Sequence, residues 1–255
     1  MSTTIQPVPG SDAKLSPKRI ARLAGLFYLF VAIFGGFAEG FADPKLYVAG
    51  DGAATAGSLV ANAGLARFNV VAHLANGVFF VLTAMALYLL LNHVNKNAAR
   101  WMVLLVVIST AMTCLNAVFQ FEGLRIATDS SWAAALGIAG SNALVLLLLD
   151  LQHYGTFAAQ VFFGLWLAPL GYLAYKSGMF PKALGVVLVA ATVSYLVDVL
   201  VVFLDPDLGT QIHGPVGIVV AVAEIWMLAY LLVKGVRSPR EADRASVADL
   251  APAAG

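Results

Sequence analysis

Six long apolar runs constrain what this chain can fold into more than any other feature. An α-helix needs about 20 mostly apolar residues, at about 1.5 Å each, to cross the hydrocarbon core of a bilayer. Six stretches meet that length: Ile20–Phe41, Phe68–Leu91, Trp101–Phe121, Tyr154–Tyr175, Leu184–Leu204 and Pro215–Val233. The sequence therefore predicts an all-α integral membrane protein, a six-transmembrane-helix bundle with short helices in its outer loops.

The composition supports this class and excludes others. Hydrophobic residues make up 60% of the 255 residues and charged residues only 11%, whereas a typical soluble domain has about 25% charged residues. We expect one membrane domain at residues 19–236, between disordered cytoplasmic tails at 1–18 and 237–255. Cys114 is the only cysteine, which excludes a disulfide and a cysteine-based zinc site. No basic block with interleaved aromatic residues suggests nucleic acid as a partner.

The placement of Lys and Arg indicates the orientation of the spans. With the N-terminus in the cytoplasm, twelve of the 15 Lys and Arg residues fall on the cytoplasmic side. The remaining three, Lys45, Arg67 and Arg125, fall outside. Because cytoplasmic loops carry the excess of basic residues, we expect a multi-pass protein of the cell (plasma) membrane with both termini in the cytoplasm.

One segment is too long for a simple span. As a single helix, Ser141–Gly178 would be about 57 Å long, which is far more than a bilayer needs. We expect a helix that begins near Asn142, bends near Gly155 and is kinked at Pro169.

The outer loops also contain helical signals. Asp51 or Thr55 can cap a short amphipathic helix that ends near Asn62. The region Ile126–Asn142 predicts a second interfacial helix, with Trp132 at the level of the lipid headgroups. Larger loops on one side of the membrane favour recognition on that side.

Five acidic residues lie in or at the ends of the apolar runs: Glu39, Glu122, Asp150, Asp198 and Glu224. A carboxylate is costly in hydrocarbon, so an acid inside a span is a candidate functional residue. At about 100° per residue, each span carries one polar stripe, and the stripes are expected to face each other rather than lipid. We therefore predict a polar cavity that opens outward and closes near Glu224. The candidate ligand-binding or proton-handling residues are Glu224, Asp198, Asp150, His153, Tyr154, His73, Glu39, Asn116 and Tyr195, with Tyr28 also facing inward.

The same residues also have structural interpretations. Polar side chains such as Asn116 often only hold membrane helices together through interhelical hydrogen bonds. Glu39 and Asp150 fall near the headgroup zone, where a carboxylate costs little. Asp198 and Glu224 lie deeper, and for these two acids we favour a functional role.

Glu224 is the deepest of the acids, about ten residues from either end of its run. No Lys or Arg shares its depth, so no opposite charge can hold it ionised. We therefore expect Glu224 to be neutral at pH 7 and hydrogen-bonded to Tyr195 or Asn116.

A metal site is the sharpest alternative to a proton-handling site. Asp150 and His153 share a helix face, and together with His73, His213 and a later acid they could supply zinc ligands. However, no HxxxH or HExxH spacing appears, and each histidine comes from a different span. We expect neither a metal nor a cofactor.

Several motifs follow one another in a distinctive order. They are RIARLAGLFYL at Arg19–Leu29, VAGDGAATAGSLVANAGLARF at Val48–Phe68, LLNHVNKNAA at Leu90–Ala99, LLLDLQHYG at Leu147–Gly155, FFGLWLAPLGYLAYKSGMFPKALGVVL at Phe162–Leu188 and LLVKGV at Leu231–Val236. In these motifs the chain resembles a bacterial family of multi-pass membrane proteins, domain of unknown function 4386. The resemblance implies a six-helix membrane domain between Arg19 and Val236 and supplies no activity or site residues.

Three functions remain open. The leading hypothesis is a membrane protein that binds or transports a small or lipid-like ligand in an outward-facing polar cavity. The second is an intramembrane enzyme that uses the histidines and carboxylates on a lipid, and the third is a non-catalytic accessory protein that assembles with partners. The expected partners are the lipid bilayer and a small-molecule or lipid ligand, and the oligomeric state stays open.

Overall fold

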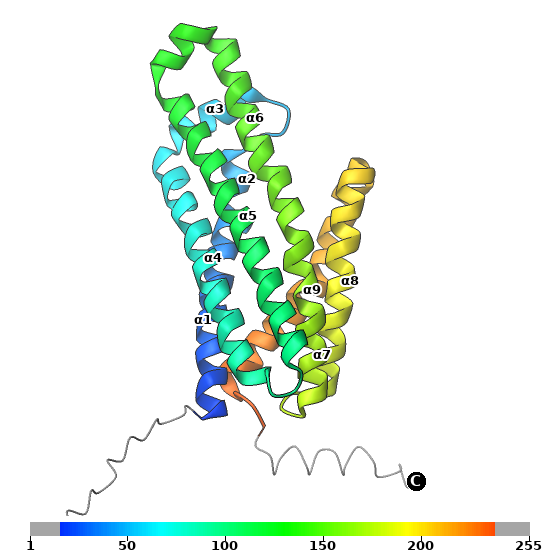
Figure 1. Cartoon of the computed structure of the whole chain (residues 1–255). Coiled ribbons are helices and arrows are strands. Elements are labelled where there is room, and N and C mark those ends of the chain that lie inside the picture. The colour runs from blue at the N-terminus through cyan, green and yellow to red at the C-terminus, as the bar shows by residue number, and fades with distance from the viewer. Residues whose placement is uncertain (1–15, 238–255) are drawn as a thin grey trace, which may run out of the picture.

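The computed structural model describes residues 16–237, and these residues form a bundle of helices (Figure 1). Six of the helical segments in this part of the chain are long and apolar enough to cross a bilayer, which confirms the predicted six-helix, all-α membrane bundle. In chain order the elements are α1 (Pro17–Phe37), the π-helical turn η1 (Ala38–Ala42), α2 (Asp43–Leu46), α3 (Gly52–Ala61), α4 (Ala63–Leu91), α5 (Lys96–Thr128), α6 (Ser130–Leu165), α7 (Leu167–Ser177), α8 (Lys182–Leu204) and α9 (Pro206–Val233).

The predicted tails lie almost entirely outside the described residues. At the N-terminal boundary, α1 already begins at Pro17, inside the predicted tail, because proline is favoured in the first turn of a helix. Figure 1 shows both ends of the described chain at the same end of the bundle, and α3 near the other end. We call these two ends the terminal end and the α3 end.

The long fourth span is interrupted at two places. Gly137 in α6 has φ 72° and ψ 159°, a conformation that glycine adopts easily, so the helix changes direction there. A second interruption at Trp166 separates α6 from α7. Pro169 cannot donate a hydrogen bond to Leu165, where α6 ends, so the predicted proline kink is confirmed. Near Gly155, where the sequence predicts a bend, α6 continues as a helix without a break.

The helix predicted in the first outer loop is present as α3. The carboxylate of Asp51 caps it and accepts a hydrogen bond from the amide of Ala54 at 2.9 Å. Thr55 has a different role, because its hydroxyl donates to the carbonyl of Val48 at 3.0 Å and so ties the loop to the helix. Leu59 of α3 belongs to an apolar cluster that covers the α3 end of the bundle.

Glycines allow the closest approach between helices, but not at the positions that simple spacing indicates. Gly36/Gly40 and Gly217/Ala221 have the small-xxx-small spacing that favours helix packing. In the structure a Cβ atom at Gly36, Gly40 or Gly217 would meet only open space. One close contact between backbones lies instead between α7 and α8, where a Cβ on Gly171 would come within 2.7 Å of the carbonyl oxygen of Gly185.

The apolar core fills the half of the bundle nearer the terminal end. Trp166 is fully buried at its centre, with the ring of Phe80 at 5.0 Å and the ring of Tyr28 at 5.8 Å. Gly25 of α1 packs against Leu231 of α9 in the same half. This packed core closes the interior of the bundle on the terminal side.

Candidate functional site

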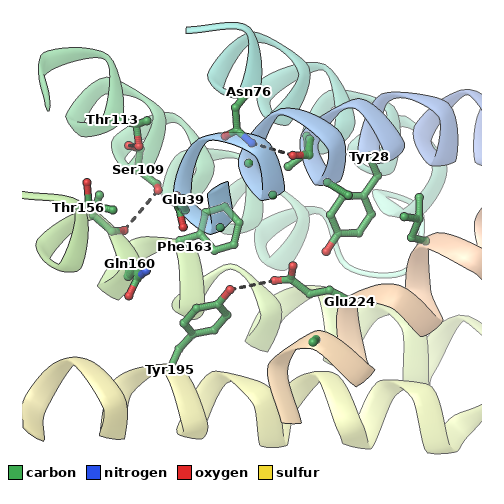
Figure 2. Close-up of a pocket in the computed structure, with 18 of the residues that line it drawn as sticks. Tyr28, Glu39, Asn76, Ser109, Thr113, Thr156, Gln160, Phe163, Tyr195 and Glu224 are labelled. Atoms are coloured by element: carbon green, nitrogen blue, oxygen red, sulfur yellow. Dashed lines mark hydrogen bonds between the residues drawn. The ribbon is translucent and has the colours of Figure 1, made fainter. Parts of the chain in front are cut away.

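The main site is a cavity of about 400 Å³ at the centre of the bundle, which we call the central cavity. Figure 2 shows its polar side chains directed toward one another from several helices. The lining comes from α1, η1, α4, α5, α6, α8 and α9, and comprises Tyr28, Val31, Ala32, Gly35, Gly36, Glu39, Gly40, Asn76, Ser109, Thr113, Thr156, Ala159, Gln160, Phe163, Tyr195, Ala221, Glu224, Ile225 and Leu228.

Glu224 lies in the wall of the central cavity with two tyrosine hydroxyls close by. The hydroxyl of Tyr195 donates to Glu224 Oε1 at 3.3 Å, so this predicted partner is confirmed (Figure 2). The hydroxyl of Tyr28 lies beside Glu224 on the other side without reaching hydrogen-bonding geometry. Asn116, the other predicted partner of Glu224, instead packs against Gly155 of α6.

A second cavity of about 290 Å³ continues from the first toward the α3 end, and we call it the α3-side cavity. It shares Glu39, Thr156 and Gln160 with the central cavity, so these three residues join the two spaces. Its other lining residues are Asp43, Pro44, Tyr47, Gln152, His153, Phe157 and His213.

Both cavities open along the side of the bundle, between the α1–η1–α2 segment and α9. Ala32, Gly36 and Pro44 on the first segment line the cavities and are nevertheless exposed. Across from them, Ala221 and Ile225 of α9 are also exposed, with Ile225 at 63%. We call this opening the α1–α9 seam. A cavity beside Glu224 is therefore present, and it opens along the side of the bundle.

A π-helical turn places Glu39 at the junction of the two cavities. The ring of Pro44 would clash with the carbonyl of Gly40, four residues earlier, in a regular helix, and Pro44 has no N–H to donate to it. Widening of the helix to η1 relieves this conflict, and the amide of Asp43 then bonds to the carbonyl of Ala38. As a result, Glu39 lines both cavities and Asp43 lines the α3-side cavity.

Asp43 is the most connected acid of the site. Its carboxylate accepts hydrogen bonds from Asn69 at 2.6 Å, Gln120 at 3.1 Å and Gln152 at 3.4 Å, and His73 Nε2 lies at 3.2 Å. The four partners come from α4, α5 and α6, and the side chain of Asp43 is 19% exposed. One carboxylate on the first span therefore holds three further helices.

Sequence reasoning missed Asp43, because the first apolar run ends at Phe41 and Asp43 then belongs to the outer loop. A usable signal was nevertheless present. Asp43 follows Glu39 by four residues, so the two acids share one helix face. The polar stripe of Asn69 and His73 on the next span then requires an acceptor at a similar depth.

Tyr47 and Asp150 form a second polar contact at the α3 end. The hydroxyl of Tyr47 donates to Asp150 Oδ1 at 2.6 Å. Burial of the Tyr47 ring and this hydrogen bond raise the pKa of the hydroxyl well above its usual range, so it remains a donor. The ring of His153 lies tilted against the ring of Tyr47, with centroids 4.9 Å apart. Asp150 and His153 therefore contact the same tyrosine, and His153 also lines the α3-side cavity.

The remaining predicted site residues lie apart from Glu224. Asp198 is 4% exposed and lines neither cavity, but its Oδ2 contacts Nδ1 of His213, a lining residue of the α3-side cavity, at 2.8 Å. Tyr154 is 48% exposed, packs against Phe203 and does not line either cavity. Tyr154 therefore does not face the cavity, in contrast to the prediction from the sequence.

The histidines do not gather around one point. His73 is paired with Asp43, His213 is paired with Asp198, and the ring of His153 lies against that of Tyr47. Among residues 16–237, no group of three or more His, Cys, Asp or Glu side chains is arranged to hold a metal ion.

Comparisons with known proteins agree with the architecture. A family model described as Domain of unknown function (DUF4386) matches residues 23–235. One relative, an uncharacterized protein of Archaeoglobus fulgidus, is 27% identical over 164 residues, which is 62% of this chain and 82% of the relative. No solved structure matches the chain.

Proposed function

Because the chain belongs to the family described as Domain of unknown function (DUF4386), a description that names no activity, we propose a function from the geometry of the site. The protein binds a small or lipid-like ligand in the central cavity and admits it through the α1–α9 seam. The observation that carries this proposal is a cavity of about 400 Å³ that is open along the side of an apolar bundle and has two acids, Glu39 and Glu224, in a lining of mostly apolar surface.

The location of the opening favours a ligand that reaches the site from the bilayer. In a membrane, the exposed apolar residues of α9 beside the seam, such as Ile218 and Ile225, contact lipid. A molecule with an apolar body can therefore move from lipid into the seam without crossing water. Its polar group then meets Glu39 or Glu224, while rings such as Phe163 contact its apolar part.

The proposed orientation places the α3 end outside the cell. The basic residues gather on the side of the two termini, and such residues are retained on the cytoplasmic side of a plasma membrane. Both cavities then lie on the outer side of the apolar core around Trp166. A ligand is therefore taken up from the outer leaflet or from outside the cell.

Reporter fusions test this orientation. Fusions after Lys96, Lys176 and Arg240 are expected to report the cytoplasm, and fusions near Asp51, Ser131 and Asp207 are expected to report the outside. The physical reason is the twelve-to-three distribution of Lys and Arg between the two sides. A cytoplasmic signal at Ser131 would contradict the arrangement of the middle spans.

Gly36→Phe is expected to block the site. A Cβ at Gly36 meets open space in the seam, so a phenyl ring can occupy the opening without disturbing the backbone. We choose 4-phenylbutanol as a neutral probe with an aromatic body and one hydroxyl. At ten times its Kd it should stabilise the wild-type protein by about 1.4 kcal/mol, measured as a rise in Tm, and should not stabilise Gly36→Phe.

Gly64→Phe is the matched control, because Gly64 is also helical, exposed and free of contacts, but lies outside both cavities. It should respond to the probe as the wild type does. The proposal fails if 4-phenylbutanol stabilises the wild type and Gly36→Phe equally, or stabilises neither the wild type nor the control.

A further inference from the structure

We propose that the ligand of the central cavity is an amphiphilic organic cation, a molecule with a protonated amine and an apolar body, which exchanges with a proton on Glu224. This inference rests on the proposed function, since it names the chemical class of the ligand for the same cavity. It follows from the charge of the lining, from one buried hydroxyl without a partner, and from the rings that surround the acids.

The ionisable lining of the central cavity is acidic. Glu39 and Glu224 both face this space, and no Lys, Arg or His is found among the described residues that line it. Farther along the site, His73 is paired with Asp43 and His213 with Asp198, while the ring of His153 lies against Tyr47 and does not line the central cavity. A cation is therefore the ligand charge that the central cavity is built to compensate.

A buried polar group without a partner points independently to a ligand. Tyr28 is 2% exposed, and its hydroxyl makes no hydrogen bond within the described part of the chain. Figure 2 shows this hydroxyl directed into the cavity toward Glu224, opposite the hydroxyl of Tyr195. Because a buried unsatisfied hydroxyl is costly, a donor group placed in the cavity beside both Tyr28 and Glu224 would complete the site. An ammonium group, with three donors, can bond to the oxygen atoms of both side chains.

The same region suits the rest of such a ligand. Tyr28, Phe163 and Tyr195 supply aromatic rings around the two acids, and a cation near the face of such a ring is attracted to it. Val31, Ile225 and other apolar lining residues lead from these rings to the seam. The apolar body of the ligand can therefore extend toward lipid while its charged group stays inside.

Exchange with a proton keeps the charge of the cavity constant. Glu224 is faced by Tyr28 and Glu39 from the first span and by Tyr195 from α8, while the lining residues of α4, α5 and α6 bring no charge. Without a cation nearby, the carboxyl group is therefore neutral in the empty site. When an ammonium group binds, the O–H bond of Glu224 breaks, the proton leaves to water, and the carboxylate pairs with the ammonium.

Calorimetry with 4-phenylbutylamine and its neutral analogue 4-phenylbutanol tests this inference. Titration at pH 7 in two buffers with different ionisation enthalpies counts the protons released on binding. We expect the amine to bind the wild type at least about thirtyfold more tightly than the alcohol and to release close to one proton, while the alcohol releases none. Glu224→Gln should lose most of the proton release and most of the preference for the amine.

Infrared spectroscopy provides a readout that does not depend on the variant folding well. The wild type at pH 7 should show a neutral carboxyl C=O band that disappears when the amine is added. Equal binding of amine and alcohol, both blocked by Gly36→Phe, would overturn the cation proposal and leave the proposed function standing. Absence of binding by either probe would overturn both, and amine binding without proton release would overturn the exchange.

Discussion

Asp43→Ala is expected to reduce the stability of the protein more than the loss of any other acid in the chain. The substitution removes an acceptor shared by Asn69, Gln120, Gln152 and His73, at distances from 2.6 to 3.4 Å. Breaking a buried charged network by removing one partner typically costs about 3–5 kcal/mol, because the remaining polar groups stay buried without partners. The donors lie on three helices, so the loss loosens the contacts of α4, α5 and α6 together.

Thermal unfolding of the detergent-solubilised protein measures this effect. Glu122→Ala is the control, because Glu122 is paired with Arg125 at 3.0 Å in a partly exposed position, and surface pairs contribute at most about 1 kcal/mol. Asp43→Asn should fall between the two, since an amide keeps one acceptor but places a donor among four donors. A Tm for Asp43→Ala close to that of the control would show that the Asp43 network does not hold the helices together.

The spans were predictable because hydrocarbon requires long apolar helices, whatever the rest of the chain does. Their ends were less so, as the third span shows: its apolar run begins at Trp101, whereas α5 begins at Lys96. The side chain of Asn95 caps the helix by accepting from the amides of Asn97 and Ala98. The hydropathy of the sequence predicts which residues lie in the bilayer, whereas capping hydrogen bonds extend the helix beyond the bilayer.

Features of the candidate site could be predicted from the sequence where they depend only on the position of a residue along one helix. The depth of Glu224 along one span follows from counting residues, and so does the position of Tyr195 on a neighbouring span of opposite direction. The partner of Asp198 could have been found in the same way. Asp198 lies six residues before the end of α8, and His213 lies seven after the start of α9, so the antiparallel pair places them side by side.

The role of Asp43 and the direction of the opening could not be predicted in this way. The direction of the opening depends on the separation of α1 from α9, which touch at Gly25 and Leu231 but leave Gly36 facing open space farther along. The role of Asp43 depends on the π-helical turn η1, which periodicity does not predict. Helix periodicity assigns residues to a face, but it does not say how far the neighbouring helix lies from that face. The space between α1 and α9 reflects the packing of the whole bundle. That packing includes the π-helical turn, which directs Asp43 inward.

Gly164→Ala is expected to impair the central cavity indirectly, by changing the packing of α6 against α8. A Cβ atom on Gly164 of α6 would fall well inside van der Waals contact with the Cβ of Tyr195 on α8. Because that atom is fixed to the backbone, α8 must move away, and overpacking of this kind costs about 1–3 kcal/mol. The movement also draws the hydroxyl of Tyr195 away from Glu224, which it now reaches at 3.3 Å.

The expected result is therefore a lower Tm together with a loss of affinity for 4-phenylbutanol. Gly36→Ala makes the same chemical change in a helix where the new methyl group meets nothing, and it should leave stability unchanged or raise it by about 0.4–1 kcal/mol. A pair of variants with the same Tm would mean that α6 and α8 can separate freely at Gly164. A lower Tm with unchanged probe affinity would mean instead that Tyr195 does not depend on this contact for its place in the cavity.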